Sequence, residues 1–342
     1  MQPFDTSTAP IATGSRDGGP NPTGPNPTGS VAAGPSLPEP LPANIRSVQP
    51  GGGTCYAVEM AWSRVRRRVL KTFRPGYVRR MAELREGSTA GAPHDILDPR
   101  DLKYCRNQCT ARWAPEHDRF AWRGNLGIAR WGWAELWLMA APVLALTVGL
   151  AFTPAWPAAI ATGLIGGWLL SFFRDPPRQV PTEPGLVVSP ADGKIAEITR
   201  LERDEFIGGP AVRIGIFLSI FNVHLNRSPV EGRVIRLRYH PGKFLNALNP
   251  ESAILNENMV IGLEETSAPF RRYTVRQIAG LFARKIVCDL TPGQAVSRGE
   301  KFGMIKLGSR TELILPDEPG LELVCQVGDT VRAGSDVFAR YH

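Results

Sequence analysis

The sequence predicts an α+β protein, in which a mainly β domain of sandwich or barrel character follows a membrane helical hairpin and a disordered N-terminus. Short runs rich in Val and Ile recur over residues 176–342, separated by Gly, Pro, Asp and Asn, which is typical of strands and turns. Upstream of them, residues 136–173 contain no charged side chain, which indicates apolar helices. The 342 residues carry a net charge of +8, so we expect an anionic partner.

Residues 1–54 form a low-complexity segment rich in Gly, Pro, Ser, Thr and Asn. Few of its side chains are apolar, so burial offers little to offset the entropy lost on ordering, and we expect a disordered tail. No basic stretch followed by an apolar run begins the chain, so we expect no cleaved signal peptide. The five scattered cysteines indicate a reducing compartment and predict no metal site.

Residues 55–125 are expected to form a basic helical extension. Between Ala61 and Arg80 there are eight Arg or Lys residues and no acidic residue, interleaved with apolar side chains. Pro75 should end or kink the helix. Three interpretations stay open: a helix lying on anionic membrane lipid, a nucleic-acid-binding helix, and a solvated helix packed on the main domain. We favour the lipid and expect no nucleic-acid partner.

Residues 126–175 are expected to form a membrane-embedded helical hairpin. Pro154 and Pro157 break the uncharged run into two apolar segments, and three tryptophans gather where the run begins, as interfacial aromatics do. Arginines flank the run on both sides, which places both ends on the cytoplasmic face of a cell membrane. A buried helical pair in a soluble core is the alternative.

Residues 176–342 are expected to form the β-rich domain. Its predicted strands lie at residues 185–189, 212–217, 233–239, 273–278, 285–290, 312–315 and 322–324. Residues 327–334 resemble the hairpin corner of lipoyl-like β domains, but there is no lysine at the tip to carry a lipoyl or biotinyl group.

Three islands in this domain contain residues that are capable of chemistry. They hold an acid, Asp192, a base, His224, and a hydroxyl, Ser309, which together are the groups needed to activate a serine. A strained Gly308-Ser309 bond beside a base is what self-cleavage by an N→O acyl shift requires. Each island also has an ordinary interpretation: a turn for the Asp and for Gly-Ser, and a core residue for the His. Spacing alone does not show that the three side chains meet.

Five motifs in order resemble the phosphatidylserine decarboxylase family, in its short Gly-Ser-Arg subfamily, over roughly residues 130–342. They are FFRDPPR at 172–178, SPADGK at 189–194, NVHLNRSP at 222–229, VRQIAG at 275–280 and FGMIKLGSR at 302–310.

The resemblance implies an inactive proenzyme that cleaves itself at Gly308-Ser309. The products would be a β chain ending at residue 308 and an α chain of residues 309–342, held together as a heterodimer that is able to dimerise further. Ser309 would become an N-terminal pyruvoyl group, the cofactor, which decarboxylates phosphatidylserine to phosphatidylethanolamine by a Schiff-base mechanism. Asp192 and His224 would assist cleavage, and whether His224 serves cleavage, proton transfer during decarboxylation or both stays open. Longer family members have two histidines in the motif at 222–229, whereas this chain has one, and Arg227 lies near the place of the other. We expect Arg227 to bind a substrate carboxylate or phosphate.

Two other functions stay open at this stage. One is a decarboxylase of a related aminophospholipid of the archaetidylserine type. The other is a non-catalytic, membrane-tethered binding module on a lipoyl-like β scaffold. Self-cleavage separates the enzymes from the binding module, because a binding module has no reason to cut itself.

Overall fold

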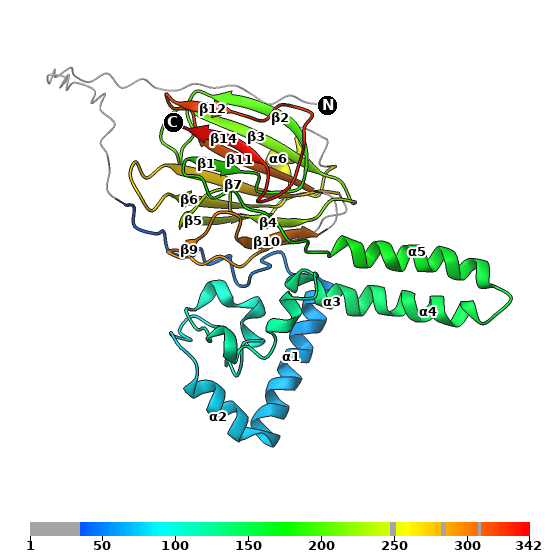
Figure 1. Cartoon of the computed structure of the whole chain (residues 1–342). Helices are drawn as coiled ribbons and strands as arrows, with labels where there is room; N and C mark the ends of the chain where they lie inside the picture. Colours follow the sequence, from blue (N-terminus) through cyan, green and yellow to red (C-terminus); the bar gives the residue numbers. More distant parts are fainter. Residues whose placement is uncertain (1–34, 247–250, 282–284, 307–308) are drawn as a thin grey trace, which may run out of the picture. The chain divides into compact units, whose positions relative to one another are not determined.

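The computed structural model describes residues 35–246, 251–281, 285–306 and 309–342 (Figure 1). The α+β prediction is confirmed, because helices precede a mainly antiparallel β domain. The helices are α1 Thr54–Phe73, α2 Pro75–Glu83, α3 Trp133–Glu135, α4 Ala141–Ala151, α5 Trp156–Phe172 and α6 Ser252–Leu255. A π-helical stretch, η6 Leu136–Ala140, joins α3 to α4, and short 3₁₀ turns occupy η1 Asp101–Tyr104, η2 Arg106–Gln108, η3 Pro115–His117, η4 Ala121–Gly124 and η5 Arg130–Gly132.

The described part of the β domain contains three antiparallel sheets. The largest has the order β13-β2-β3-β11-β7-β6-β5-β9, and the smaller two have the orders β4-β10-β8 and β1-β14-β12. The strands are β1 Leu186–Val188, β2 Gly193–Leu201, β3 Ala211–Leu218, β4 Leu225–Arg227, β5 Gly232–His240, β6 Asn258–Glu264, β7 Arg272–Ala279, β8 Lys285–Cys288, β9 Ala295–Val296, β10 Lys301–Lys306, β11 Ser309–Pro316, β12 Leu321–Leu323, β13 Thr330–Val331 and β14 Val337–Tyr341.

All seven predicted runs overlap strands, but the sequence pattern missed the long strands β2 and β6. Strand β2 alternates buried and exposed residues at its start, so its charged side chains hide the apolar face. Strand β11 lies near the middle of the largest sheet, between β3 and β7, and each of its residues is buried. The main core takes side chains from all three sheets.

The expectation of a disordered tail over residues 1–54 divides into two parts. Residues 1–34 lie outside the described residues. Residues 35–54 differ from the expectation, because they lie against the β domain: Glu39 N–H donates to Ile235 O at 2.7 Å, and Val48 O accepts from Cys288 N–H at 2.8 Å. Ile45 and Val48 are buried. A segment with few apolar residues is ordered here because it joins a core and a set of backbone partners that another part of the chain supplies.

The extension begins with α1 and α2, which meet at Pro75 as expected. The basic face of α1 is partly used inside the protein: Arg66 pairs with Asp98, and the Arg67 Nη1 lies 3.4 Å from the carboxylate of Asp101. A small hydrophobic core holds the rest of the extension together. It is built from Met81, Ile96, Leu102, Cys105, Cys109, Ala111 and Trp113.

The apolar run forms two helices that lie side by side, joined by a short turn (Figure 1). One helix in the described part, Arg130–Ala151, is long and apolar enough to cross a membrane, with a mean hydropathy of 1.7, and α5 is apolar but shorter. Thr147 and Thr162 join the helices through a hydrogen bond of 2.9 Å between their hydroxyls. Pro142 lacks an N–H, which accounts for the widened π-helical stretch before it.

A second core joins the base of these helices to the β4-β10-β8 sheet. It includes Leu169 and Phe172 of α5 together with Leu225 of β4 and Met304 of β10. Beside it, Lys306 at the end of β10 bonds both to Glu135 and to the Oε1 of Gln49, at 3.0 Å. The strand that leads to residue 309 is therefore attached to the start of the apolar helices.

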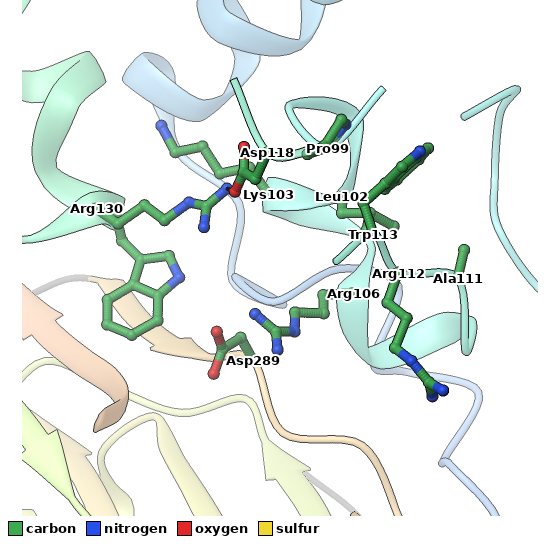
Figure 2. Close-up of a pocket in the computed structure, with 11 residues that line it drawn as sticks. Pro99, Leu102, Lys103, Arg106, Ala111, Arg112, Trp113, Asp118, Arg130 and Asp289 are labelled. Carbon is green, nitrogen blue, oxygen red and sulfur yellow. Dashed lines mark hydrogen bonds and ion pairs between the residues drawn. The ribbon is translucent and has the colours of Figure 1, made fainter. Parts of the chain in front are cut away.

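The extension also meets the β domain across a small charged cavity of about 110 Å³ (Figure 2). Asp289, just after β8, faces Arg106 of the extension and Arg130 at the start of the apolar helices, and burial raises the pKa of its carboxyl to about 6. The two arginines oppose this rise, because they favour the charged carboxylate.

Candidate active site

Ser309 is the first residue of β11, and it pairs with Leu218 of β3 and Ala279 of β7. Its side chain is fully buried, and its Oγ has no hydrogen-bond partner within the part of the chain that the structure describes. A buried hydroxyl without a partner is costly and is characteristic of functional positions. The other half of the predicted cleavage site, Gly308, lies outside the described residues.

His224 immediately precedes β4 and is 1% exposed. Its Nδ1 lies 2.9 Å from Asn222 O, and since a carbonyl oxygen only accepts, Nδ1 carries the proton and Nε2 holds the lone pair. The imidazole packs against the Phe172 ring at the end of α5, with 4.4 Å between centroids. Burial lowers the pKa of His224 to about 4, so the ring is neutral at neutral pH and is able to accept a proton at Nε2.

The sheet β4-β10-β8 brings His224 close in space to the strand end that precedes Ser309. The carbonyl of His224 accepts a hydrogen bond of 3.1 Å from Ile305 N–H, and Met304 pairs with Leu225. Ile305 lies four residues before Ser309, so base and hydroxyl belong to the same end of the domain.

Asp192 lies in the turn before β2, and its partners differ from those of a serine triad. Arg178 binds both carboxylate oxygens, at 2.9 and 2.7 Å, and the Ala333 N–H donates to Oδ1 at 2.8 Å. Burial raises the pKa of Asp192, and these partners oppose the rise. Among the described bonds of Asp192 none reaches His224, so the structure does not join the acid to the base.

Arg227 is bound on two sides. Its guanidinium donates to Gly299 O at 3.0 Å and to the Oδ1 of Asp175 at 3.2 Å, and the Lys301 Nζ lies 2.6 Å from the other oxygen of Asp175. These bonds attach the segment after α5 to β4 and β10. Binding of substrate by Arg227 stays a prediction.

Three buried polar residues that sequence reasoning missed connect the site strands. Gln277 of β7 donates to the Oδ1 of Asn226 at 2.9 Å, and the Asn226 amide donates to the Oγ1 of Thr311 at 3.1 Å. All three are 0% exposed. The available signal was an amide side chain within an apolar strand pattern, in the motifs at 222–229 and 275–280.

Comparison of the sequence with known proteins identifies the family. A sequence model of the family described as phosphatidylserine decarboxylase matches residues 165–339. The chain belongs to the phosphatidylserine decarboxylase family. The phosphatidylserine decarboxylase proenzyme of Rhodopirellula baltica is 52% identical over 240 residues, which cover 70% of this chain and 99% of that protein.

Two other proteins called phosphatidylserine decarboxylase proenzyme are also similar. That of Nitrosomonas eutropha is 40% identical and that of Symbiobacterium thermophilum 43% identical, each over 214 residues. These residues cover 63% and 62% of this chain, respectively, and 95% of each relative.

The stretch matched by the decarboxylase family model contains every predicted site residue, and within it the motif at 172–178 connects the islands. Phe172 packs on His224, Arg174 donates to Phe221 O at 2.7 Å, and Arg178 binds Asp192. Burial dominates the pKa of both His224 and Asp192; the charge of Arg174 adds to the fall in the pKa of His224 and opposes the rise in the pKa of Asp192. The end of the apolar hairpin therefore shapes the candidate active site of this family member.

Proposed function

We propose that the chain is a phosphatidylserine decarboxylase proenzyme of the Gly-Ser-Arg subfamily, which cleaves itself between Gly308 and Ser309. The observation that carries this proposal is the buried Ser309 hydroxyl, which has no partner among the described residues, at the same end of the domain as a neutral, buried His224. Water competes poorly with the Ser309 hydroxyl as the nucleophile at such a site, because both side chains are almost fully enclosed.

The cleavage would proceed within the chain. Ser309 Oγ attacks the Gly308 carbonyl carbon as the hydroxyl proton passes to His224 Nε2, and the C–N bond breaks to give an ester and a free amine on residue 309. Loss of the residue-309 α proton and cleavage of the Cβ–O bond then release the Gly308 carboxylate. One water enters, ammonia leaves, and a ketone remains at the start of the α chain.

Ser309 is a suitable origin for the pyruvoyl group, because its Oγ has no competing partner in the described residues and strands β3 and β7 hold its backbone. The pyruvoyl group supplies a carbonyl that withdraws electrons from the substrate amine during loss of carbon dioxide. Arg310 anchors the new chain end, since its Nε bonds to Glu312 at 3.0 Å and its guanidinium also pairs with Glu197. The Arg276 Nη1 lies 2.7 Å from the Glu312 carboxylate, so this carboxylate is paired with two arginines.

Two further roles belong to this proposal. Asp192 would assist cleavage by fixing Arg178, and thereby the segment that packs on His224, rather than by touching the imidazole. Arg227 would bind a substrate carboxylate or phosphate by exchanging one of its present partners.

The substrate and the location follow from the same arrangement. The hairpin of residues 126–175 would be embedded in the cell membrane with both ends on the cytoplasmic face, flanked by the extension of residues 55–125 and the catalytic domain of residues 176–342. Ile220 and Phe221 are exposed just beyond Leu218, the strand partner of Ser309, which fits a site that faces lipid. We propose phosphatidylserine as substrate and an α/β heterodimer, able to dimerise further, as the mature form.

Intact mass measurement of the purified wild type beside Ser309→Ala tests the proposal. We expect two wild-type chains, the smaller spanning residues 309–342 with a ketone-reactive, blocked N-terminus, and one uncut Ser309→Ala chain. Turnover of phosphatidylserine against an archaetidylserine-type lipid then identifies the substrate. A single uncut chain in both samples would refute the enzyme and leave a binding module.

A further inference from the structure

A groove of about 230 Å³ lies between α1 and the start of the apolar helices, outside the stretch that the family model matches. Its walls include Trp62 of α1, Trp133 of α3, and Trp137 and Leu138 of the π-helical stretch. Arg100 and Arg123 line it as well. The groove therefore combines cations with large apolar side chains.

Arg100 and Arg123 have no ion-pair partner among the described residues. No carboxylate in the described ranges lies within ion-pair distance of Arg100 or Arg123, and the Arg123 Nε is buried without an acceptor. Burial, and then the charge of Arg100, lower the pKa of Arg123. The acidic lining residue is Glu59, which is already bonded to the Lys103 Nζ at 2.7 and 2.9 Å. An anion placed here would relieve an uncompensated positive charge.

A second buried donor points to the same conclusion. The indole Nε1 of Trp133 is buried and has no acceptor among the described residues. The Arg123 guanidinium lies over the Trp133 ring, 5.9 Å from its centroid, and over the Trp122 ring at 5.4 Å. Arginine and indole donors that lie together without an acceptor suit the oxygens of a phosphate.

The remainder of the groove is apolar and continuous with a surface that faces outward. Trp62 is 56% exposed and Trp137 67% exposed. Along α1 the exposed apolar residues recur every three or four positions, as Val58, Trp62, Val65, Val69 and Phe73. Helix α1 runs crosswise to the α4–α5 hairpin (Figure 1), so an inserted hairpin would set the axis of α1 along the membrane surface.

We propose that this groove binds one anionic glycerophospholipid, with the phosphate held by Arg100 and Arg123 and an acyl chain lying along Trp62, Trp137 and Leu138. Charge complementarity and the position beside the membrane-crossing helix select this occupant over a soluble ligand. The inference rests on the proposed membrane attachment but is independent of the pyruvoyl chemistry. The bound lipid would hold the extension at the membrane surface.

Native mass spectrometry of the full-length wild type in mild detergent tests this site. The probe is phosphatidylglycerol, which is anionic but has no amine to react with a ketone, and phosphatidylcholine is the comparison lipid. We expect one phosphatidylglycerol per chain, bound at least tenfold more tightly than phosphatidylcholine. Arg100→Gln/Arg123→Gln should abolish that preference, whereas Arg64→Gln/Arg68→Gln removes the same charge from exposed positions of α1 and should retain it.

Cleavage into two chains is visible in the same spectra, so it reports folding and tests the proposed enzyme separately. If the double variant does not fold, Arg100→Gln alone serves, because Arg100 has no ion pair to lose among the described residues. Equal binding of both lipids by the wild type, or an unchanged preference in the groove variants, would overturn the proposal. So would displacement of the lipid by inorganic phosphate, which would indicate a simple phosphate site.

Discussion

The buried pair between Glu135 and Lys306 should be the strongest single attachment between the apolar helices and the strand that leads to Ser309. The two side chains are only 11% and 8% exposed. Glu135→Gln removes the negative charge that faces the buried Lys306 ammonium and leaves it only neutral amide acceptors, Gln49 among them, which costs about 3 kcal/mol, the low end for a broken buried pair. At roughly 2–4 °C per kcal/mol, Tm should fall by about 6–12 °C.

Thermal unfolding in detergent, on the Ser309→Ala background so that every chain stays uncut, measures this effect. Glu135→Leu/Lys306→Met should restore most of the loss, because removing both charges leaves nothing buried and unpaired. Glu86→Gln is the matched control: its pair with Arg112 is mostly exposed and worth about 0–1 kcal/mol. A Tm shift for Glu135→Gln no larger than that control, or additive effects in the double variant, would refute the reasoning.

Three further predictions concern the site. Between its ordinary pKa of about 6.5 and about pH 4, His224 takes up a proton in the unfolded chain but not in the folded one, so the free energy of unfolding should fall by about 3 kcal/mol as the pH drops through that window. His224→Gln should flatten this pH dependence in thermal melts, and an unchanged pH dependence would contradict the assignment. Asn226→Ala removes one of the two acceptors of the Gln277 amide and the donor to Thr311 Oγ1, so the free energy of unfolding in urea should fall by about 1–3 kcal/mol. An unchanged free energy would show that the network contributes nothing. Gly303→Ala places a Cβ 2.0 Å from Val287 O, which would push strand β10 away from β8, so the fraction of cleaved chain on gels should drop. Full cleavage would mean that the site forms even when these two strands move apart.

Local patterns in the sequence were sufficient for several features. The Val- and Ile-rich runs located seven strands, the uncharged run located the apolar helices, and Pro75 located the break between α1 and α2. Each of these depends on the chemistry of neighbouring residues alone: side-chain alternation, absence of charge, or a missing N–H. The Gly308-Ser309 bond and the family motifs are likewise readable along the chain, and the family membership that they predicted is confirmed.

Only the tertiary structure decided which groups face one another. Asp192 pairs with Arg178 rather than with His224, and Asn226 bonds to Thr311. Residues 35–54 pack against strands that lie far from them in the sequence. The tertiary structure also turned part of the basic face of α1 inward and left an apolar stripe exposed. These contacts join residues far apart in the chain, so they depend on strand register and on how separate elements pack, and neither is encoded in local composition.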